Sequence, residues 1–432
     1  MTTNPSKNLS ALTPNQIRGF WAAWGGWALD GMDSFIYALV MVPALTDLLP
    51  RSGISASTGE VGFYGGLLFA LFLIGWGFSL VWGPLADRFG RVRALMLSIL
   101  CYSLFTFLGA AATRVWQLAV FRLLAGVGIG GEWSMGGTFV AEEWPEDRRK
   151  RAAGYMHTGY YFGFLLAALA NHTVGAHFGW RAMFVIGGAP AFLVFFIRAG
   201  VRESDRFTSR SKELSSRWSM HQAFFSLFQP EYRKRTVVNA LLVLISIVGL
   251  WAGSVYVPAA LTDLATRAGL TPLQGIRLAS VGTILLAVGT ILGCLLMPDL
   301  AEWWGRRATL GAFFGLMLVF ISAGFGFVFY LHAHAIGWFL VCLFFLGVGG
   351  ANFAVYTLWL PEQYRTESRA SAFAFATSLG RFVGAGITFW VGWGVSHYHT
   401  IGKPVAWTSI AFLLGLLLLL WGEETKGKPL PS

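Results

Sequence analysis

The chain has 432 residues, of which 55% are hydrophobic and only 12% are charged. A soluble domain carries about 25% charged residues, so this composition excludes an ordinary soluble protein and indicates a polytopic membrane protein. The net charge of +11 would suit a nucleic-acid partner, but the placement of the basic residues, described below, argues against one.

Twelve apolar runs are long enough to cross the hydrocarbon core of a bilayer, which is roughly 30 Å thick. In chain order they cover residues 20–48, 61–82, 94–112, 116–141, 152–174, 180–200, 236–260, 278–297, 308–331, 337–360, 370–395 and 405–421. The polar stretch 201–235 divides them into two groups of six. We therefore expect an all-α membrane protein with twelve transmembrane helices in two pseudo-symmetric six-helix bundles, 20–200 and 236–421, between polar ends 1–19 and 422–432.

Lysine and arginine residues gather on one side of these spans. If both ends of the chain are cytoplasmic, 24 of them fall in cytoplasmic segments and six in outer loops. Such residues prefer the cytoplasmic side of a membrane. The bias predicts cytoplasmic termini and explains the basic charge without nucleic acid.

A loop sequence recurs at a distance of almost half the chain. The loop after the second span reads Gly83-Pro-Leu-Ala-Asp87-Arg88-Phe-Gly90-Arg91, and the loop after the eighth reads Pro298-Asp-Leu-Ala-Glu302-Trp-Trp-Gly305-Arg306-Arg307. The acid, the glycine and the arginine keep the same spacing in both copies. Duplicated halves of this kind are typical of transporters whose halves rock about a central site.

These motifs resemble those of the major facilitator superfamily, and the resemblance covers the whole chain. It implies a cytoplasmic latch, in which a carboxylate at one helix end pairs with arginine and with the positive end of a neighbouring helix. The residues assigned to the latch are Gly83, Asp87, Arg88, Gly90 and Arg91, with Glu302, Gly305 and Arg306 from the second copy.

Two further motifs are similar to the organic-acid:proton symporter branches of that superfamily. They are Asp30-Gly-Met-Asp33 in the first span and Gly130-Gly-Glu132-Trp133 in the fourth. Sialate and monocarboxylate symporters are the nearest branches, with aromatic-acid symporters next. The segment that starts at Arg122 resembles the signature associated with proton coupling, whereas the proline-containing signature of drug exporters is absent from the fifth span.

Five ionisable residues fall inside predicted spans: Asp30, Asp33, Arg122, Glu132 and Arg381. Each costs about 2.5–3.5 kcal/mol on insertion scales, so we expect these residues to face one another or a wet cavity. At about 1.5 Å per residue, Asp33, Arg122 and Arg381 reach similar depths near the middle of the bilayer. We assign the coupling proton to Asp30 and Asp33, modulated by Arg122. A fixed Asp33–Arg122 ion pair is the alternative, and Glu132 either braces its helix or also carries protons.

Arg381 is the candidate for binding an anionic substrate, because a guanidinium matches a carboxylate at two points. A purely structural partner for another polar group is the alternative. Four uncharged polar residues are candidate pocket lining, although such residues often only bridge helices: Tyr160, Asn239, Asn352 and Gln363. His157, near the inner end of the fifth span, either titrates near neutral pH or sits in a solvated position.

We therefore expect a proton-coupled symporter that imports a small organic anion, such as sialate or a monocarboxylate, by alternating access. An exporter or exchanger, and a substrate sensor without transport, are the alternatives. No nucleophile, phosphate loop or metal-binding spacing is visible, so we expect neither an enzyme nor a cofactor, with protons as the coupling ion. The expected partners are the substrate, protons and lipid. We expect a monomer in a bacterial inner membrane.

Overall fold

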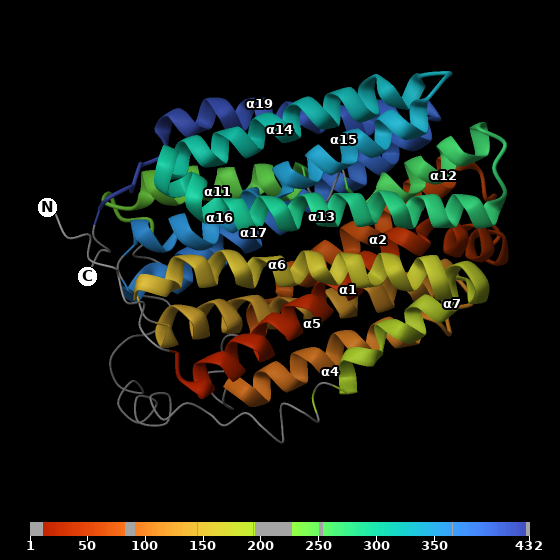
Figure 1. The fold of residues 1–432 in the computed structure, drawn as a ribbon. Helices are drawn as coiled ribbons and strands as arrows, with labels where there is room; N and C mark the ends of the chain where they lie inside the picture. Colours follow the sequence, from red (N-terminus) through yellow and green to blue (C-terminus); the bar gives the residue numbers. More distant parts are fainter. Residues whose placement is uncertain are drawn as a thin grey trace, which may run out of the picture.

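The structure, a computed structural model, describes residues 12–82, 91–144, 146–192, 194, 227–249, 254–364 and 366–428. Every regular element within these ranges is helical, which confirms the predicted all-α class. The helices lie side by side along one direction (Figure 1). Six helices of the described ranges are long and apolar enough to cross a membrane.

The N-terminal half begins earlier than its first apolar run. Its helices are α1 (Pro14–Arg51), α2 (Thr58–Phe78), α4 (Arg91–Gly109), α5 (Val115–Glu143), α6 (Glu146–Ala170) and α7 (Ala176–Gly187), with a π-helical turn at Asn171–Gly175 and short 3-10 turns at Ser79–Val81 and Ala189–Phe192. The start of α1 lies ahead of the predicted residue 20 because Thr13 and Gln16 form a capping box, with Pro14 in the first turn.

In the C-terminal half, three of the predicted spans are interrupted. Its helices are α11 (Arg233–Ile247), α12 (Val257–Arg267), α13 (Pro272–Trp304), α14 (Arg306–Gly326), α15 (Ala335–Gly350), α16 (Asn352–Trp359), α17 (Thr366–Tyr398), α18 (Gly402–Trp407) and α19 (Ser409–Leu418), with 3-10 turns at Val328–Tyr330, Pro361–Gln363 and Leu419–Trp421. The seventh span is divided between α11 and α12, the tenth between α15 and α16, and the twelfth between α18 and α19. Thr271 and Gln274 repeat the capping box and start α13 ahead of the predicted residue 278.

The two halves meet mainly along two helix pairs, α2 with α17 and α6 with α13. Hydrogen bonds also cross the boundary. Tyr256 donates its hydroxyl to the carbonyl of Gly62 at 3.2 Å, and Asn171 donates to Ser280 at 3.0 Å. The start of α1, the start of α11 and the end of α19 all lie at one end of the bundle (Figure 1). The linker prediction 201–235 falls largely outside the described residues.

Close contact between α1 and α6 sets the position of the central side chains. A methyl group on Gly31 would overlap the carbonyl of Tyr160, and one on Gly163 would overlap the carbonyl of Ala28. Glycine at both positions lets the two backbones touch, as in packed membrane helices. The acidic residues of α1 are thereby held against the aromatic residues of α6.

Candidate functional site

The acidic residues predicted in the first span lie in the middle of the bundle. Asp30 and Asp33 are both fully buried on α1. Asp33 interacts electrostatically with Arg122 of α5 and faces Thr106 of α4. Within the described residues, neither the carboxylate oxygens of Asp33 nor the guanidinium nitrogens of Arg122 have a hydrogen-bond partner. The structure thus brings together the predicted pair, and their attraction is through space.

Aromatic faces support the buried cation of this pair. The guanidinium carbon of Arg122 lies 4.3 Å from the ring centroid of Phe72 and 5.1 Å from that of Tyr37. A cation over an aromatic face gains about 0.5–2 kcal/mol, more when water is excluded. The aromatic faces therefore offset part of the cost of burying this cation.

Arg381 of α17 comes from the other half of the chain and rests on the same face of α2. Its guanidinium carbon lies 4.4 Å from the ring centroid of Trp76, and its side chain is buried. Phe72 and Trp76 are four residues apart, so they project from one side of α2. Two arginines from opposite halves are thereby held over neighbouring rings of a single helix.

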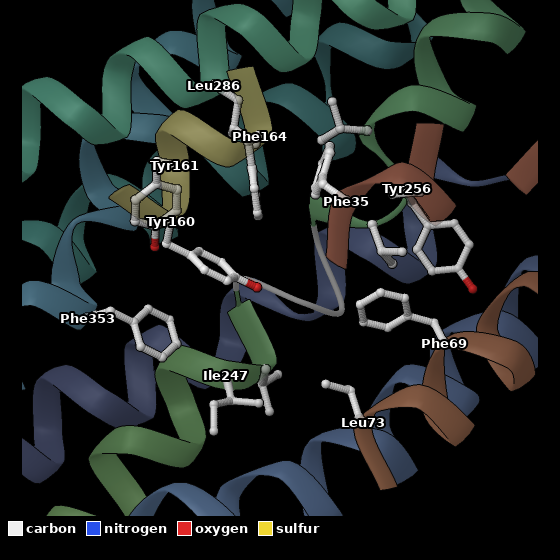
Figure 2. Packing of buried hydrophobic residues seen from close by; sticks show 14 of the residues in the cluster. Phe35, Phe69, Leu73, Tyr160, Tyr161, Phe164, Ile247, Tyr256, Leu286 and Phe353 are labelled. Carbon is white, nitrogen blue, oxygen red and sulfur yellow. The ribbon is translucent and has the colours of Figure 1, made fainter. Parts of the chain in front are cut away.

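Tyr160 of α6 connects the acidic and basic residues. Its hydroxyl interacts electrostatically with Asp30, Asp33 and Arg381. Figure 2 shows the Tyr160 ring near the centre of the core, with Phe353 of α16 and Ile247 of α11 from the other half beside it. The site therefore lies between the two halves, as the depth argument predicts for Asp33 and Arg381.

Three aromatic or imidazole side chains around Tyr160 are absent from the predicted site. The ring of Trp27 lies 4.7 Å from that of Tyr160 and 6.2 Å from that of His157, and Trp76 lies 6.4 Å from Tyr160. His157 is 4% exposed and stacks nearly parallel to Phe353 of the other half. The expectation of a solvated His157 is wrong, because α6 turns this side chain toward the interface between the halves.

The uncharged polar candidates are less uniform in their surroundings. Asn239 donates to Gln363 at 3.0 Å and to the hydroxyl of Tyr364 at 3.1 Å, so two of the candidates bind each other. Asn352 donates to the carbonyl of Gly349 at 2.9 Å and is fully buried. These contacts connect helices within the C-terminal half, which is the bridging role that the sequence left open.

The second copy of the repeated loop forms a compact ionic cluster. Arg306 donates from two nitrogens to Glu362, at 2.8 and 3.0 Å, and lies 3.4 Å from Glu302. The carboxylate of Glu424 accepts the backbone N–H groups of Arg306 and Arg307 at 3.0 and 3.1 Å. Carboxylate, arginine and helix end meet here, but the carboxylate at the helix end is Glu424 and not the predicted Glu302.

Glu424 takes the place of a missing cap on α14. Burial alone would raise the pKa of Glu424, but the N–H donors outweigh that effect and lower the pKa below its usual range. Gly305 precedes the helix with a φ of 92°, and a methyl group there would lie 2.6 Å from a Glu424 oxygen. Glycine is therefore required at this position both for its backbone conformation and for space.

Part of the predicted site cannot be compared in this way. The first latch copy, with Gly83, Asp87, Arg88, Gly90 and the side chain of Arg91, lies outside the described residues, and so does the side chain of Glu132. Their roles stay predictions.

Comparisons with known proteins agree with this geometry. Residues 23–389 match the family model described as Major Facilitator Superfamily. The chain is 29% identical to a probable 4-methylmuconolactone transporter of Cupriavidus pinatubonensis, over 96% of this chain and 92% of that protein. It is 28% identical to the niacin transporter of Acinetobacter baylyi, over 95% of each chain.

The fold also resembles that of solved structures. A D-xylose-proton symporter superposes with a TM-score of 0.74 at 19% identity, over 96% of this chain and all of the other. The likeness confirms the predicted twelve-helix arrangement in two bundles, and at this identity it concerns the fold alone.

Proposed function

The chain belongs to the major facilitator superfamily, and from that premise we propose that it is a proton-coupled symporter which imports a small organic carboxylate. Its membership confirms a multi-pass membrane transporter rather than an enzyme. One observation carries the finer proposal: Asp30, Asp33 and Arg381 all lie within electrostatic range of the Tyr160 hydroxyl. Groups suited to a proton and to an anion therefore share one buried centre between the two halves.

Asp33 carries the coupling proton in this proposal. Its carboxylate is attracted by Arg122 through space, so protonation breaks no hydrogen bond between these two side chains. When Asp33 is protonated, Arg122 loses this electrostatic attraction and keeps only its contacts with Phe72 and Tyr37. The proton thereby changes the forces between α1 and α5, which is the kind of local change that can bias two packed arrangements.

Arg381 binds the carboxylate of the substrate. Its guanidinium lies over Trp76, and a guanidinium matches a carboxylate at two points. Trp27, Trp76 and Tyr160 supply flat apolar faces around the same centre. Niacin and 4-methylmuconolactone, after which two relatives are named, are small ring carboxylates. We therefore infer that ring-containing carboxylates are candidate substrates alongside sialate and lactate.

Uptake by proteoliposomes under an inward pH gradient tests the proposal. The panel contains sialate, lactate, nicotinate and 4-hydroxybenzoate, each measured with and without the gradient. We expect gradient-dependent uptake of at least one acid and its loss in Arg381→Ala. Arg267→Ala is the matched control, because Arg267 also lies over an aromatic ring, at 4.3 Å from Phe329, but is partly exposed.

The outcomes separate the competing functions. Undiminished uptake by Arg381→Ala would remove Arg381 from substrate binding. Efflux that is accelerated by an opposing proton gradient would replace the symporter with an exporter. Binding of an acid without any flux in either direction would favour a sensor. We further propose a bacterial inner membrane with both termini in the cytoplasm, which accessibility labelling of single cysteines at Arg18 and Lys403 would test.

A further inference from the structure

A groove opens on the outer surface of the C-terminal half, remote in sequence from the central residues. It has a volume of about 450 Å³ and lies between the start of α11 and the end of α19. Its walls include Arg233, Lys234, Val237, Leu241, Leu418 and Trp421. The surface of the groove is almost wholly apolar, and the basic residues stand at its end.

The spacing of these residues gives the groove its two parts. Arg233, Val237 and Leu241 follow one another at intervals of four residues, so they form a stripe along one face of α11. Val237 is 51% exposed and Leu241 is 41% exposed, although both are apolar. Trp421, 58% exposed, ends the last apolar span on the opposite wall. Tryptophan at this level is typical of the boundary between lipid tails and headgroups.

Two cations, Arg233 and Lys234, stand at the end of the groove where α11 starts. Within the part of the chain that the structure describes, neither Arg233 nor Lys234 forms an ion pair, and the first turn of α11 holds no acidic residue. Glu423 lies nearby but is already bound by Arg235 at 2.6 Å and by Lys428 at 3.0 Å. No described carboxylate pairs with these two cations, so they are available to an anionic headgroup.

We propose that this groove binds an anionic phospholipid from the leaflet on the side of the chain termini. The phosphate contacts Arg233 and Lys234, and one acyl chain lies along Val237 and Leu241 toward Leu418. Clustered basic residues beside a membrane span attract anionic lipids by about 1 kcal/mol each. A lipid suits the site better than a free phosphate, since only a lipid covers the apolar stripe as well as the charges.

Native mass spectrometry on the purified full-length chain tests the site, with phosphatidylglycerol and phosphatidylcholine of identical acyl chains as probes. We expect the wild type to bind phosphatidylglycerol more tightly. Two charges at about 1 kcal/mol each predict that Arg233→Gln with Lys234→Gln lowers this affinity about thirty-fold. Val237→Trp keeps both charges but fills the groove, and it should also weaken phosphatidylglycerol binding.

The control is Arg18→Gln with Arg93→Gln, which removes two exposed charges from helices of the other half. Unchanged phosphatidylglycerol binding by this control, together with the loss in the groove variants, supports the site. Equal losses in both double variants would reduce the effect to net charge and overturn the proposal. Displacement of the lipid by glycerol 3-phosphate at equal concentration would also overturn it, since the groove would then serve only as an anion site.

Discussion

Replacing Asp33 with Asn keeps the shape of the side chain and removes its charge. Asp33 is fully buried and Arg122 is 1% exposed, so the loss of the carboxylate leaves a buried cation without its counter-charge. Breaking such a pair costs about 3–5 kcal/mol. Arg122 keeps its contacts with Phe72 and Tyr37, which are worth up to about 2 kcal/mol, so we expect the lower end of that range.

Transport should separate into two parts in this variant. Cotransport of one proton with one monoanion moves no net charge, so a gradient of one pH unit supports about ten-fold accumulation, because one pH unit equals 1.36 kcal/mol. Asp33→Asn should abolish this accumulation. Exchange of labelled for unlabelled substrate at equal pH should continue, because it needs no net movement of protons.

Asp47→Asn provides the matched control in the same helix. Asp47 pairs with Arg181 at 2.7 Å and with Arg51 at 2.9 Å near the opposite end of α1 from Thr13, and its loss should leave accumulation intact. The double variant Asp33→Asn with Arg122→Gln should regain part of the lost thermal stability, since no unpaired charge is left. Accumulation at the wild-type level in Asp33→Asn, or equal loss of accumulation and exchange in a well-folded sample, would refute the assignment.

Four other predictions follow from the contacts of single residues. Trp76→Leu should raise the substrate KM several-fold in uptake assays, because Arg381 loses the ring that orients it, while Phe in place of Trp should retain most of the affinity. Asn239→Ala should lower the melting temperature without changing KM, because its amide bridges helices. A change in KM without a change in melting temperature would instead indicate that Asn239 lines the substrate pocket. Glu424→Gln should lower the free energy of unfolding by about 1 kcal/mol, as for a lost helix cap. This difference from the wild type should shrink at acid pH. Because the pKa of Glu424 is lowered in the folded chain, its stabilisation is present above about pH 4 and is lost as the pH falls through that pKa. Gly163→Ala should destabilise by about 1–3 kcal/mol through overpacking against α1, whereas alanine at Gly315, which has open space around it, should have little effect on the melting curve.

The depth of each charge could be predicted from sequence, because helix rise converts residue number directly into height in the membrane. That arithmetic placed Asp33, Arg122 and Arg381 at one level, and the structure brings the first two together. The direction in which a side chain points from its helix does not follow from its depth. Asn239 and Gln363 look like pocket residues by depth and polarity, yet they bind each other within one half.

The aromatic residues escaped prediction for a related reason. Trp27 and Trp76 are two of 19 tryptophans, so residue type alone carries little information in this chain. Only their spacing indicates a place near the site: Trp27 lies three residues before Asp30 and Trp76 four residues after Phe72, so each pair shares a helix face. The starts of α1 and α13 were also predictable from sequence. The repeated Thr-Pro-x-Gln at Thr13 and Thr271 marks both capping boxes, but these polar residues lie outside the apolar runs.

The carboxylate that closes the start of α14 comes from far along the chain. In the hydrogen bond between Arg306 and Glu424, 118 residues separate the partners. At about 5–20 residues per second, translation adds Glu424 roughly 6–24 s after Arg306. During that interval the N–H groups of Arg306 and Arg307 depend on water or headgroups. Maturation of the second half is therefore a late event in biosynthesis, and stalled ribosome complexes that end before Glu424 should expose this helix end to proteases.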